Sequence, residues 1–188
     1  MRAFFCIPIP DVLRDSIDAI ARDLRSKTTM HASWVALENY HVTLGFLGDI
    51  DASLTVPLEA LCRSLCTATA PFECVLDQVG AFPDADRARV IWVGGDAPQP
   101  FRKLSSALGA GLEELGFPRA RSESHVHVTL TRIKDHPDPS LSNLIIRANP
   151  IELGRLFVDR IVLMESVLTQ RGAIYSPLFT VNLRQPSA

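Results

Sequence analysis

The sequence has no surplus of positive charge. Its 19 lysines and arginines stand against 21 aspartates and glutamates among 188 residues, so the formal net charge is −2. A protein that follows a long nucleic-acid backbone usually carries a basic surplus or stripe. We therefore expect any nucleic-acid partner to be bound at one end or at one nucleotide, and a local basic cleft remains compatible with this charge.

Two further absences narrow the class of protein. There is no Cys-x-x-Cys pair among Cys6, Cys62, Cys66 and Cys74, and the chain is long enough to fold without disulfide bonds. The apolar stretch over residues 4–9 is too short for a signal sequence or a membrane span. We expect buried thiols, no membrane contact and a cytoplasmic location.

The chain also lacks a low-complexity tract and an evident linker, so we expect a single domain over residues 1–188. Hydrophobic periodicity predicts helices over about 11–26, 53–68 and 100–115, the first capped by Asp11, and a helical turn after 140. Strands are predicted over about 2–9, 33–37, 40–47, 72–79, 89–93, 125–132, 155–164 and 173–183.

What the sequence does contain is a repeated tetrapeptide. His-Val-Thr-Leu occurs at positions 41–44 and again at 127–130. The order of predicted elements puts one copy in each of two halves that contain strands and helices. We therefore predict an α+β fold with two pseudo-two-fold-related halves, in which antiparallel strands and flanking helices surround a central cleft.

Each copy puts an imidazole and a hydroxyl on one face of a strand. Alternate residues point the same way, so His41 stands beside Thr43 and His127 beside Thr129, about 7 Å apart at Cα. Two facing pairs would supply an acid and a base for in-line displacement at phosphorus, worth about 10²–10⁴-fold in rate. The hydroxyls would donate to the charge developing on the non-bridging oxygens, and no metal or cofactor is required.

The residues that follow the two copies differ. Phe46, after the first copy, offers a nucleobase a flat apolar surface. Arg132, after the second, is suited to hold a phosphate oxygen or to stack on a base. Counting in twos from His127 puts Thr131 on the cleft face and Arg132 off it, unless the strand contains a bulge. Three other large aromatic residues are expected in the core or the cleft wall: Trp34, Phe82 and Trp92.

Two plainer interpretations stand beside this one. Val, Thr and Leu are common in strands, so a single copy would be an ordinary strand with a half-buried histidine. His125 and His127 form an H-x-H pair that can bind zinc, if His31, His41 or an acidic residue supplies a third ligand. We keep His125 as a polar cleft or base contact, with no metal bound.

The two H-x-T-x motifs resemble the signature of the 2H phosphoesterase superfamily. Several stretches resemble its bacterial and archaeal RNA 2′,3′-cyclic phosphodiesterase branch, also called LigT or ThpR: MRAFFCIPIP, HVTLGFLGDI, RVIWVGG, HVTLTR and MESVLTQRGAIYSPL. The resemblance covers nearly the whole chain. It implies a bilobed α+β fold and metal-independent opening of an RNA or nucleoside 2′,3′-cyclic phosphate to a 2′-phosphate.

The resemblance also implies a role for each motif residue. His41 would be the general acid that protonates the leaving 3′ oxygen, and His127 the base that activates water. Three further residues would bind the phosphate, namely Thr43, Thr129 and Arg132. The expected partners are therefore RNA 3′ ends or nucleotides that bear a 2′,3′-cyclic phosphate, and we expect a monomer.

One stretch departs from the family pattern. An Arg-Pro-aromatic approach commonly precedes the second motif, with a proline just before its histidine, whereas residues 121–126 here read Arg-Ser-Glu-Ser-His-Val. This departure leaves the cleft edge and the base preference open. Two alternative functions also stay open: joining or cleaving 2′–5′ RNA linkages, and a non-catalytic module that grips RNA ends.

Overall fold

The computed structural model describes residues 1–118, 125–170 and 172–184. Its four α-helices are α1 (Asp11–Ser26), α2 (Thr55–Ala68), α3 (Gln99–Glu114) and α4 (Leu141–Ala148) within that part of the chain. The strands are β1 (Arg2–Pro8), β2 (Ala32–Trp34), β3 (His41–Asp49), β4 (Phe72–Leu76), β5 (Gln78–Phe82), β6 (Val90–Asp96), β7 (His125–Ile133), β8 (Gly154–Val158), β9 (Arg160–Thr169) and β10 (Gly172–Asn182).

Most of the strands belong to one sheet. It has eight strands in the order β10-β9-β1-β3-β7-β6-β5, with β2 added beside β7, and β4 pairs with β8 in a separate ladder. The pairings are antiparallel throughout. The predicted α+β class with antiparallel strands is therefore confirmed. The two strands that carry the repeated tetrapeptide, β3 and β7, are neighbours at the centre of the sheet.

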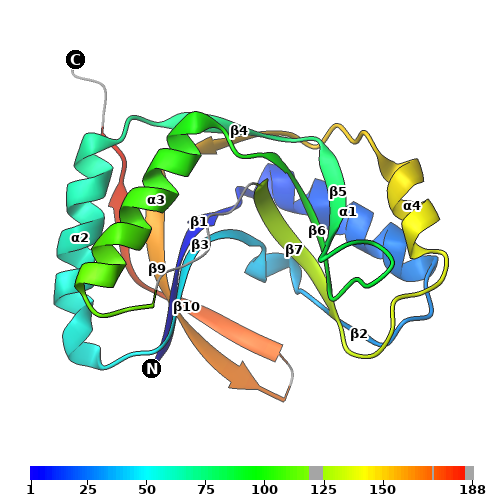
Figure 1. Cartoon of the computed structure of the whole chain (residues 1–188), viewed down its shortest axis with the longest axis horizontal. Helices are drawn as coiled ribbons and strands as arrows, with labels where there is room; N and C mark the ends of the chain where they lie inside the picture. The colour runs from blue at the N-terminus through cyan, green and yellow to red at the C-terminus, as the bar shows by residue number, and fades with distance from the viewer. Residues whose placement is uncertain (119–124, 171, 185–188) are drawn as a thin grey trace.

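The helices lie on one face of the sheet because each has an apolar stripe. In α1 the buried residues are Leu13, Ile17, Ala21 and Leu24, at helical spacing. They join the main core together with the buried residues of α2 and α3 and with alternate residues of β1. Figure 1 shows α2 and α3 side by side at one end of the sheet and α1 and α4 at the other.

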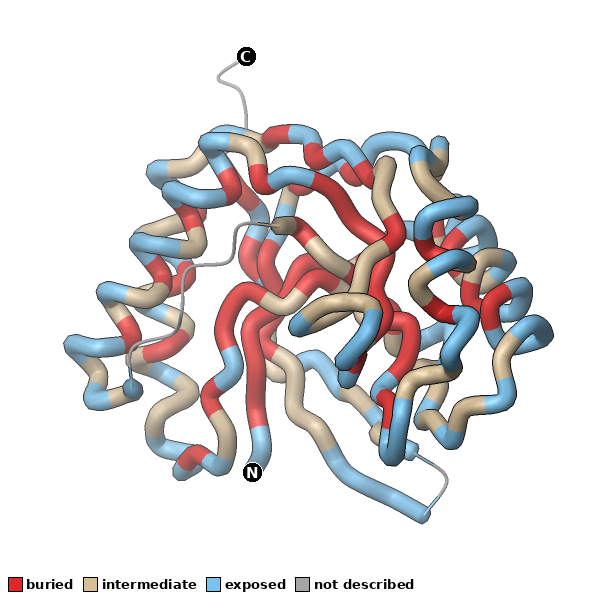
Figure 2. Tube along the Cα trace, turned by 45° about the vertical axis from the view of Figure 1, so that its right-hand side comes forward, coloured by how far each residue is buried: buried red, intermediate tan, exposed pale blue. Residues whose placement is uncertain are grey.

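The opposite face of β1 carries a second, smaller cluster. Phe5 and Ile7 point into the main core, whereas Phe4 and Cys6 point away from it and pack with Val162 of β9. We call this side of the sheet, opposite the main core, the site face. In Figure 2 the central strands are the most continuously buried part of the chain.

The hairpin of β9 and β10 extends beyond the neighbouring strand. β1 pairs with β9 only over residues 162–165, while β10 accompanies β9 as far as Thr169. The end of the hairpin projects from the body of the molecule, as Figures 1 and 2 show. No helix in the described ranges is both long enough and apolar enough to cross a membrane.

Three predicted strands are corrected. The strand expected at 33–37 is limited to β2, and Leu37–Asn39 form a 3₁₀ turn instead. The strands expected at 72–79 and 155–164 each divide in two, at Asp77 and at Asp159, and the two parts of each join different sheets. Two polar residues interrupt the apolar pattern at each division, Asp77 and Gln78 in one and Asp159 and Arg160 in the other, and the pattern resumes directly after them. So short an interruption does not by itself reveal the change of sheet.

The predicted cap of the first helix is also wrong by one residue. Asp11 is the first residue of α1, and Pro10 precedes it without a side-chain cap. The Asp11 carboxylate accepts a hydrogen bond from Arg14 instead, at 2.9 Å. An acidic side chain in the first turn still stabilises the helix, because it faces the positive end of the helix dipole.

Candidate active site

The register between β3 and β7 brings the two tetrapeptides together. Val42 lies opposite Val128 in the antiparallel pair, and each is the second residue of its tetrapeptide. By this register, the position of each histidine is opposite the threonine position of the other copy, where cross-strand side chains are neighbours. All four side chains are half-buried. The structure thus gathers both predicted pairs on the site face.

A β-bulge in β7 adds Arg132 to this group. While β7 advances two residues from Thr129 to Thr131, its partner β6 advances one, so Leu130 is an extra residue. Leu130 and Thr131 are both buried, and Arg132 is exposed. The alternation shifts at the bulge, and Arg132 therefore points to the same side as Thr129.

Thr131 is consequently not a site residue, which corrects the count in twos made from the sequence. It is fully buried, and its Oγ1 donates to the carbonyl of Ser33 in β2 at 3.0 Å. A period of two holds only until an extra residue enters the strand. A bulge is defined by the partner strand, so one strand's sequence does not display it.

The first tetrapeptide has a bulge at the same place. β1 advances one residue while β3 advances two from Thr43, which makes Leu44 the extra residue. Phe46 then lies opposite Phe4 and is 56% exposed. Phe46 and Arg132 therefore occupy the same position in the two motifs, three residues after the threonine, but one is an aromatic ring and the other a cation.

His41 is oriented by a backbone hydrogen bond. Its Nδ1 lies 2.7 Å from the carbonyl oxygen of Asn39. A carbonyl only accepts, so Nδ1 carries the hydrogen and Nε2 is the nitrogen left to exchange a proton. The ring packs against Phe4, with centroids 4.8 Å apart, and edge-on against Tyr175 of β10, at 5.4 Å.

The support of His41 continues into the projecting hairpin. The Asn39 side chain donates from Nδ2 to the carbonyl of Ala173 at 2.8 Å. Tyr175, two residues further along β10, also contacts Phe4 edge-on, at 4.9 Å between centroids. The β9–β10 hairpin therefore contacts His41 directly through Tyr175 and supports it indirectly through Asn39.

The surroundings of His41 favour its neutral form. Burial lowers its pKa below the usual value, and the positive charges of Arg132 and His127 lower it further, against the opposing effect of the Asn39 carbonyl. A phosphate anion bound between the two histidines would reverse this balance, because an opposite charge within a few ångströms stabilises the imidazolium.

His127 packs against other aromatic rings than His41 does. Its ring is edge-on to Phe82, at 5.1 Å between centroids, and lies 6.3 Å from Trp92. Trp92 is 5% exposed and covers Gly80, where a Cβ would lie 2.1 Å from the indole Cζ2. Glycine is therefore required at position 80 to leave room for this indole. Phe82 and Trp92 form a wall of the site, as the sequence suggested.

His125 borders the site through the same indole. Its ring lies 5.4 Å from that of Trp92, and its Nε2 is 3.8 Å from Oδ1 of Asp96. It shares a face of β7 with His127, which places it at the edge of the site. The altered approach to the second motif, residues 121–124, lies outside the described residues.

The hydroxyls of Thr43 and Thr129 form no hydrogen bond within the described part of the chain. The buried Thr131, in contrast, donates to the Ser33 carbonyl. A hydroxyl that is half-buried and unengaged is available to a ligand. Both are thus placed to donate to an anion on the site face.

Two positive side chains stand near the His41 side of the site. Burial raises the pKa of Tyr175, and the charges of Arg132 and Arg2 act on it in the opposite direction. Cζ of Arg2 lies 4.9 Å from the ring centroid of Phe46. Sequence reasoning missed Arg2, Phe4 and Tyr175, because only strand order places β1 and β10 beside the first motif. It also missed Asn39, whose segment it read only as a turn.

The zinc alternative finds no third ligand in the described part of the chain. No group of three or more His, Cys, Asp or Glu side chains that could hold a metal occurs there. His31, which was weighed as a ligand, is exposed, and its Nδ1 lies 3.1 Å from Oδ2 of Asp135. His136 is also exposed.

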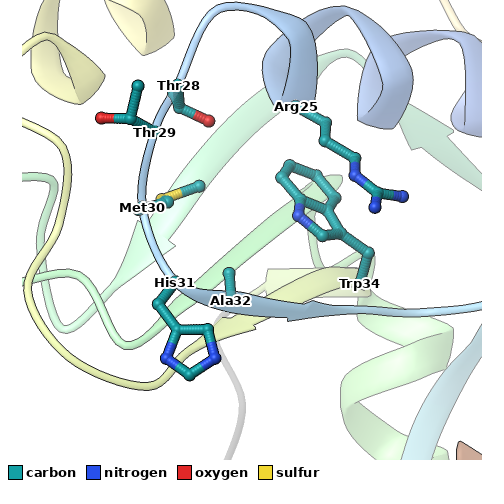
Figure 3. Close-up of a pocket in the computed structure, with 7 residues that line it drawn as sticks. All are labelled: Arg25, Thr28, Thr29, Met30, His31, Ala32 and Trp34. Carbon is teal, nitrogen blue, oxygen red and sulfur yellow. The ribbon is translucent and has the colours of Figure 1, made fainter.

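A cavity of about 250 Å³ lies on the other side of the sheet. It is formed between the end of α1 and β2, as Figure 3 shows, and is lined by Arg25, Thr28, Thr29, Met30, His31, Ala32 and Trp34. Ser33 lies opposite Arg132 and so faces the site, whereas its neighbours Ala32 and Trp34 face the cavity. This cavity contains none of the motif residues and is separate from the candidate site.

The chain matches a known protein family over most of its length. A family described as LigT-like phosphoesterase matches residues 7–92 and 95–175. A protein of Aeropyrum pernix named RNA 2′,3′-cyclic phosphodiesterase is 34% identical over 162 residues, which cover 85% of this chain and 91% of that protein. One of the same name from Thermotoga maritima is 33% identical and covers 95% and 94% of the two chains.

Solved structures agree in fold over nearly the full length. A crystal structure of a Thermus thermophilus protein superposes with a TM-score of 0.82 at 27% identity, covering 98% of both chains. The crystal structure of Escherichia coli LigT complexed with 3′-AMP superposes with a TM-score of 0.77 at 25% identity, with the same coverage.

Proposed function

This chain belongs to the LigT-like phosphoesterase family of the 2H superfamily, and from that membership we propose that it hydrolyses 2′,3′-cyclic phosphates on RNA or nucleosides. It is a hydrolase of phosphoric diesters. The observation that carries the proposal is the register of β3 and β7, which sets the two His/Thr pairs against each other on one face. Two proton-transfer groups across a single site suit a displacement that needs an acid and a base.

In the proposed mechanism the two histidines act on opposite sides of the phosphorus. His127 accepts a proton from water, and the oxygen attacks phosphorus in line with the 3′ oxygen. His41 delivers a proton from Nε2 to that 3′ oxygen as the bond breaks, which leaves a 2′-phosphate. The hydrogen bond from Nδ1 to Asn39 supports this role, because it aims the other nitrogen away from the backbone.

The remaining motif residues hold the phosphate in this proposal. Thr43 and Thr129 donate from both sides to the non-bridging oxygens, and Arg132 pairs with the same anion. The unengaged hydroxyls and the position of Arg132 on the site face support these roles. E. coli LigT has been crystallised with 3′-AMP, a nucleotide with its phosphate on the ribose, which suits a site of this kind.

We also propose that the two halves are related by a pseudo-two-fold axis between Val42 and Val128 within one domain. Their pairing and the matching bulges at Leu44 and Leu130 support this relation. The axis passes through the phosphate site. The two histidines thereby occupy equivalent positions in the backbone. Their chemical surroundings differ, because Phe46 follows one motif and Arg132 the other.

Product analysis tests the function. The purified protein is incubated in EDTA with an oligonucleotide that ends in a 2′,3′-cyclic phosphate, and the product is identified by its phosphate position. We expect a 2′-phosphate at an undiminished rate. A 3′-phosphate, or activity only after a metal is added, would contradict the mechanism. Tight binding of the cyclic end without turnover would point to a non-catalytic module.

A further inference from the structure

The His41 side of the site has an open aromatic surface that the described residues on the His127 side do not provide. Phe46 is 56% exposed, whereas Trp92 is 5% exposed and Phe82 is half-buried. The ring of Phe46 also lies roughly parallel to Phe4, with an interplanar angle of 18°. An exposed ring at the rim of a nucleotide site is a surface that a nucleic-acid strand can use.

A cation is fixed on this surface. Cζ of Arg2 lies 4.9 Å from the ring centroid of Phe46, within the range of a cation–π contact. Arg2 forms no ion pair with any residue in the described ranges, although Asp49 lies opposite it in the register of β1 and β3. The edge of the guanidinium therefore keeps donors for an outside acceptor.

The position of Arg2 relative to the reacting group follows from β1. Arg2 and Phe4 point to the same side, about 7 Å apart at Cα by the strand rise. The Phe4 ring lies 4.8 Å from that of His41. Arg2 is therefore close to the site but outside the two motifs, whereas Arg132 lies within the second motif.

The chemistry decides which way an RNA strand leaves the site. If His41 protonates the 3′ oxygen, the ribose lies on the His41 side of phosphorus and the water on the His127 side. The preceding nucleotide is attached through the 5′ carbon of that ribose. The direction from phosphorus to the ribose thus points toward the His41 side, where Phe46 and Arg2 lie.

We propose that Arg2, held over Phe46, binds the phosphate that joins the last two nucleotides of an RNA 3′ end. This inference rests on the function proposed above. Arg132 serves the cyclic phosphate and Arg2 the next phosphate along the strand, so the enzyme prefers an oligonucleotide to a mononucleotide. A protein with net charge −2 thereby recognises a strand end without a basic stripe.

The test compares two substrates, adenosine 2′,3′-cyclic phosphate and the dinucleotide ApA that ends in a 2′,3′-cyclic phosphate. We expect a higher kcat/KM for the dinucleotide. Because one exposed charge-assisted contact is lost, the ratio of the two constants should fall about 3- to 30-fold in Arg2→Gln. The negative slope of log kcat/KM against log salt for the dinucleotide should also become shallower by about 0.7, as expected for the loss of one phosphate contact to a single strand.

Two variants separate the contact from general charge. Arg63→Gln removes an equal charge from the exposed face of α2, where Arg63 pairs with Glu59, and should leave the substrate ratio unchanged. Arg2→Lys keeps the charge but loses the planar fork, and should retain the salt slope with an intermediate ratio. An unchanged ratio in Arg2→Gln, or a ratio of one in the wild type, would overturn the proposal.

A binding measurement keeps the inference separate from the proposed activity. Fluorescence anisotropy with labelled ApA that carries a terminal 2′-phosphate reports the contact even if neither substrate is hydrolysed. Weaker binding in Arg2→Gln than in Arg63→Gln would support the subsite independently of catalysis. Equal binding by these two variants would contradict the subsite, while absence of hydrolysis with both substrates would contradict the proposed function alone.

Discussion

Val42 and Val128 lie opposite each other at the centre of the sheet, and each is the second residue of a His-Val-Thr-Leu tetrapeptide. Side chains at both positions are buried, so the two valines themselves face the core. Their neighbours on either side therefore face the other way, onto the site face. One apolar pair thus sets the position of both histidines and both threonines.

The two histidines should respond differently to the leaving group. With a cyclic phosphate, His41→Ala and His127→Ala should each lose about 10²–10⁴-fold in kcat. With a 4-nitrophenyl phosphodiester of a nucleoside, the leaving group departs without a proton. His41→Ala should then retain most of the wild-type rate, while His127→Ala should not. The reverse pattern would exchange the two roles, and equal losses with both substrates would contradict the division of labour.

The pH dependence of kcat/KM should reflect the lowered pKa of His41. The profile should be bell-shaped, with two apparent pKa values that belong to the pair. We expect the lower value to lie below 6.5, the ordinary value for histidine, because burial and the positive charges of Arg132 and His127 disfavour the imidazolium. Below that pH both rings are protonated and no base remains.

Arg132→Gln tests whether the charge of Arg132 lowers the pKa of His41. Removal of one nearby positive charge raises the pKa of His41, so the acidic limb should move to higher pH while kcat/KM falls overall. An acidic limb that stays in place or moves to lower pH would show that Arg132 does not act on His41.

Thr129 and Thr131 form a matched pair for a test of the bulge. Thr129→Val removes an unengaged hydroxyl on the site face and should lower kcat about 10- to 100-fold with little change in stability. Thr131→Val removes the donor to the Ser33 carbonyl and should cost about 0.5–1.5 kcal/mol in the free energy of unfolding, with activity retained. Rate assays and urea denaturation measure both, and an active Thr129→Val would refute its phosphate role.

Gly80→Ala should act on His127 through Trp92. The added Cβ would lie 2.1 Å from the indole, so the ring must move, at a cost of about 1–3 kcal/mol in the free energy of unfolding. Since Trp92 packs against His127, kcat should fall as well. Gly109→Ala is the control, because nothing lies within 4 Å of its Cβ in α3 and alanine favours a helix by about 0.5–1 kcal/mol. An unaltered kcat in Gly80→Ala would show that Trp92 does not position His127 for catalysis.

The sequence predicted the helices well and the strands less well. Helices α1, α2 and α3 begin and end within a few residues of the prediction, because their apolar spacing is a local property. The divisions at Asp77 and Asp159 were missed, since each depends on which partner the chain meets there. The 3₁₀ turn before β3, which places the carbonyl of Asn39 against His41, was read only as a turn.

By itself, the sequence determined that two histidines and two threonines stand in pairs on strands, because the period of two is a property of the extended backbone. Only the tertiary structure decided what surrounds them. The bulge in β7 put Arg132 rather than Thr131 on the site face, the register placed Val42 opposite Val128, and strand order placed Tyr175 beside His41. Each of these depends on a partner strand far away in the sequence, and a local pattern contains no information about that partner.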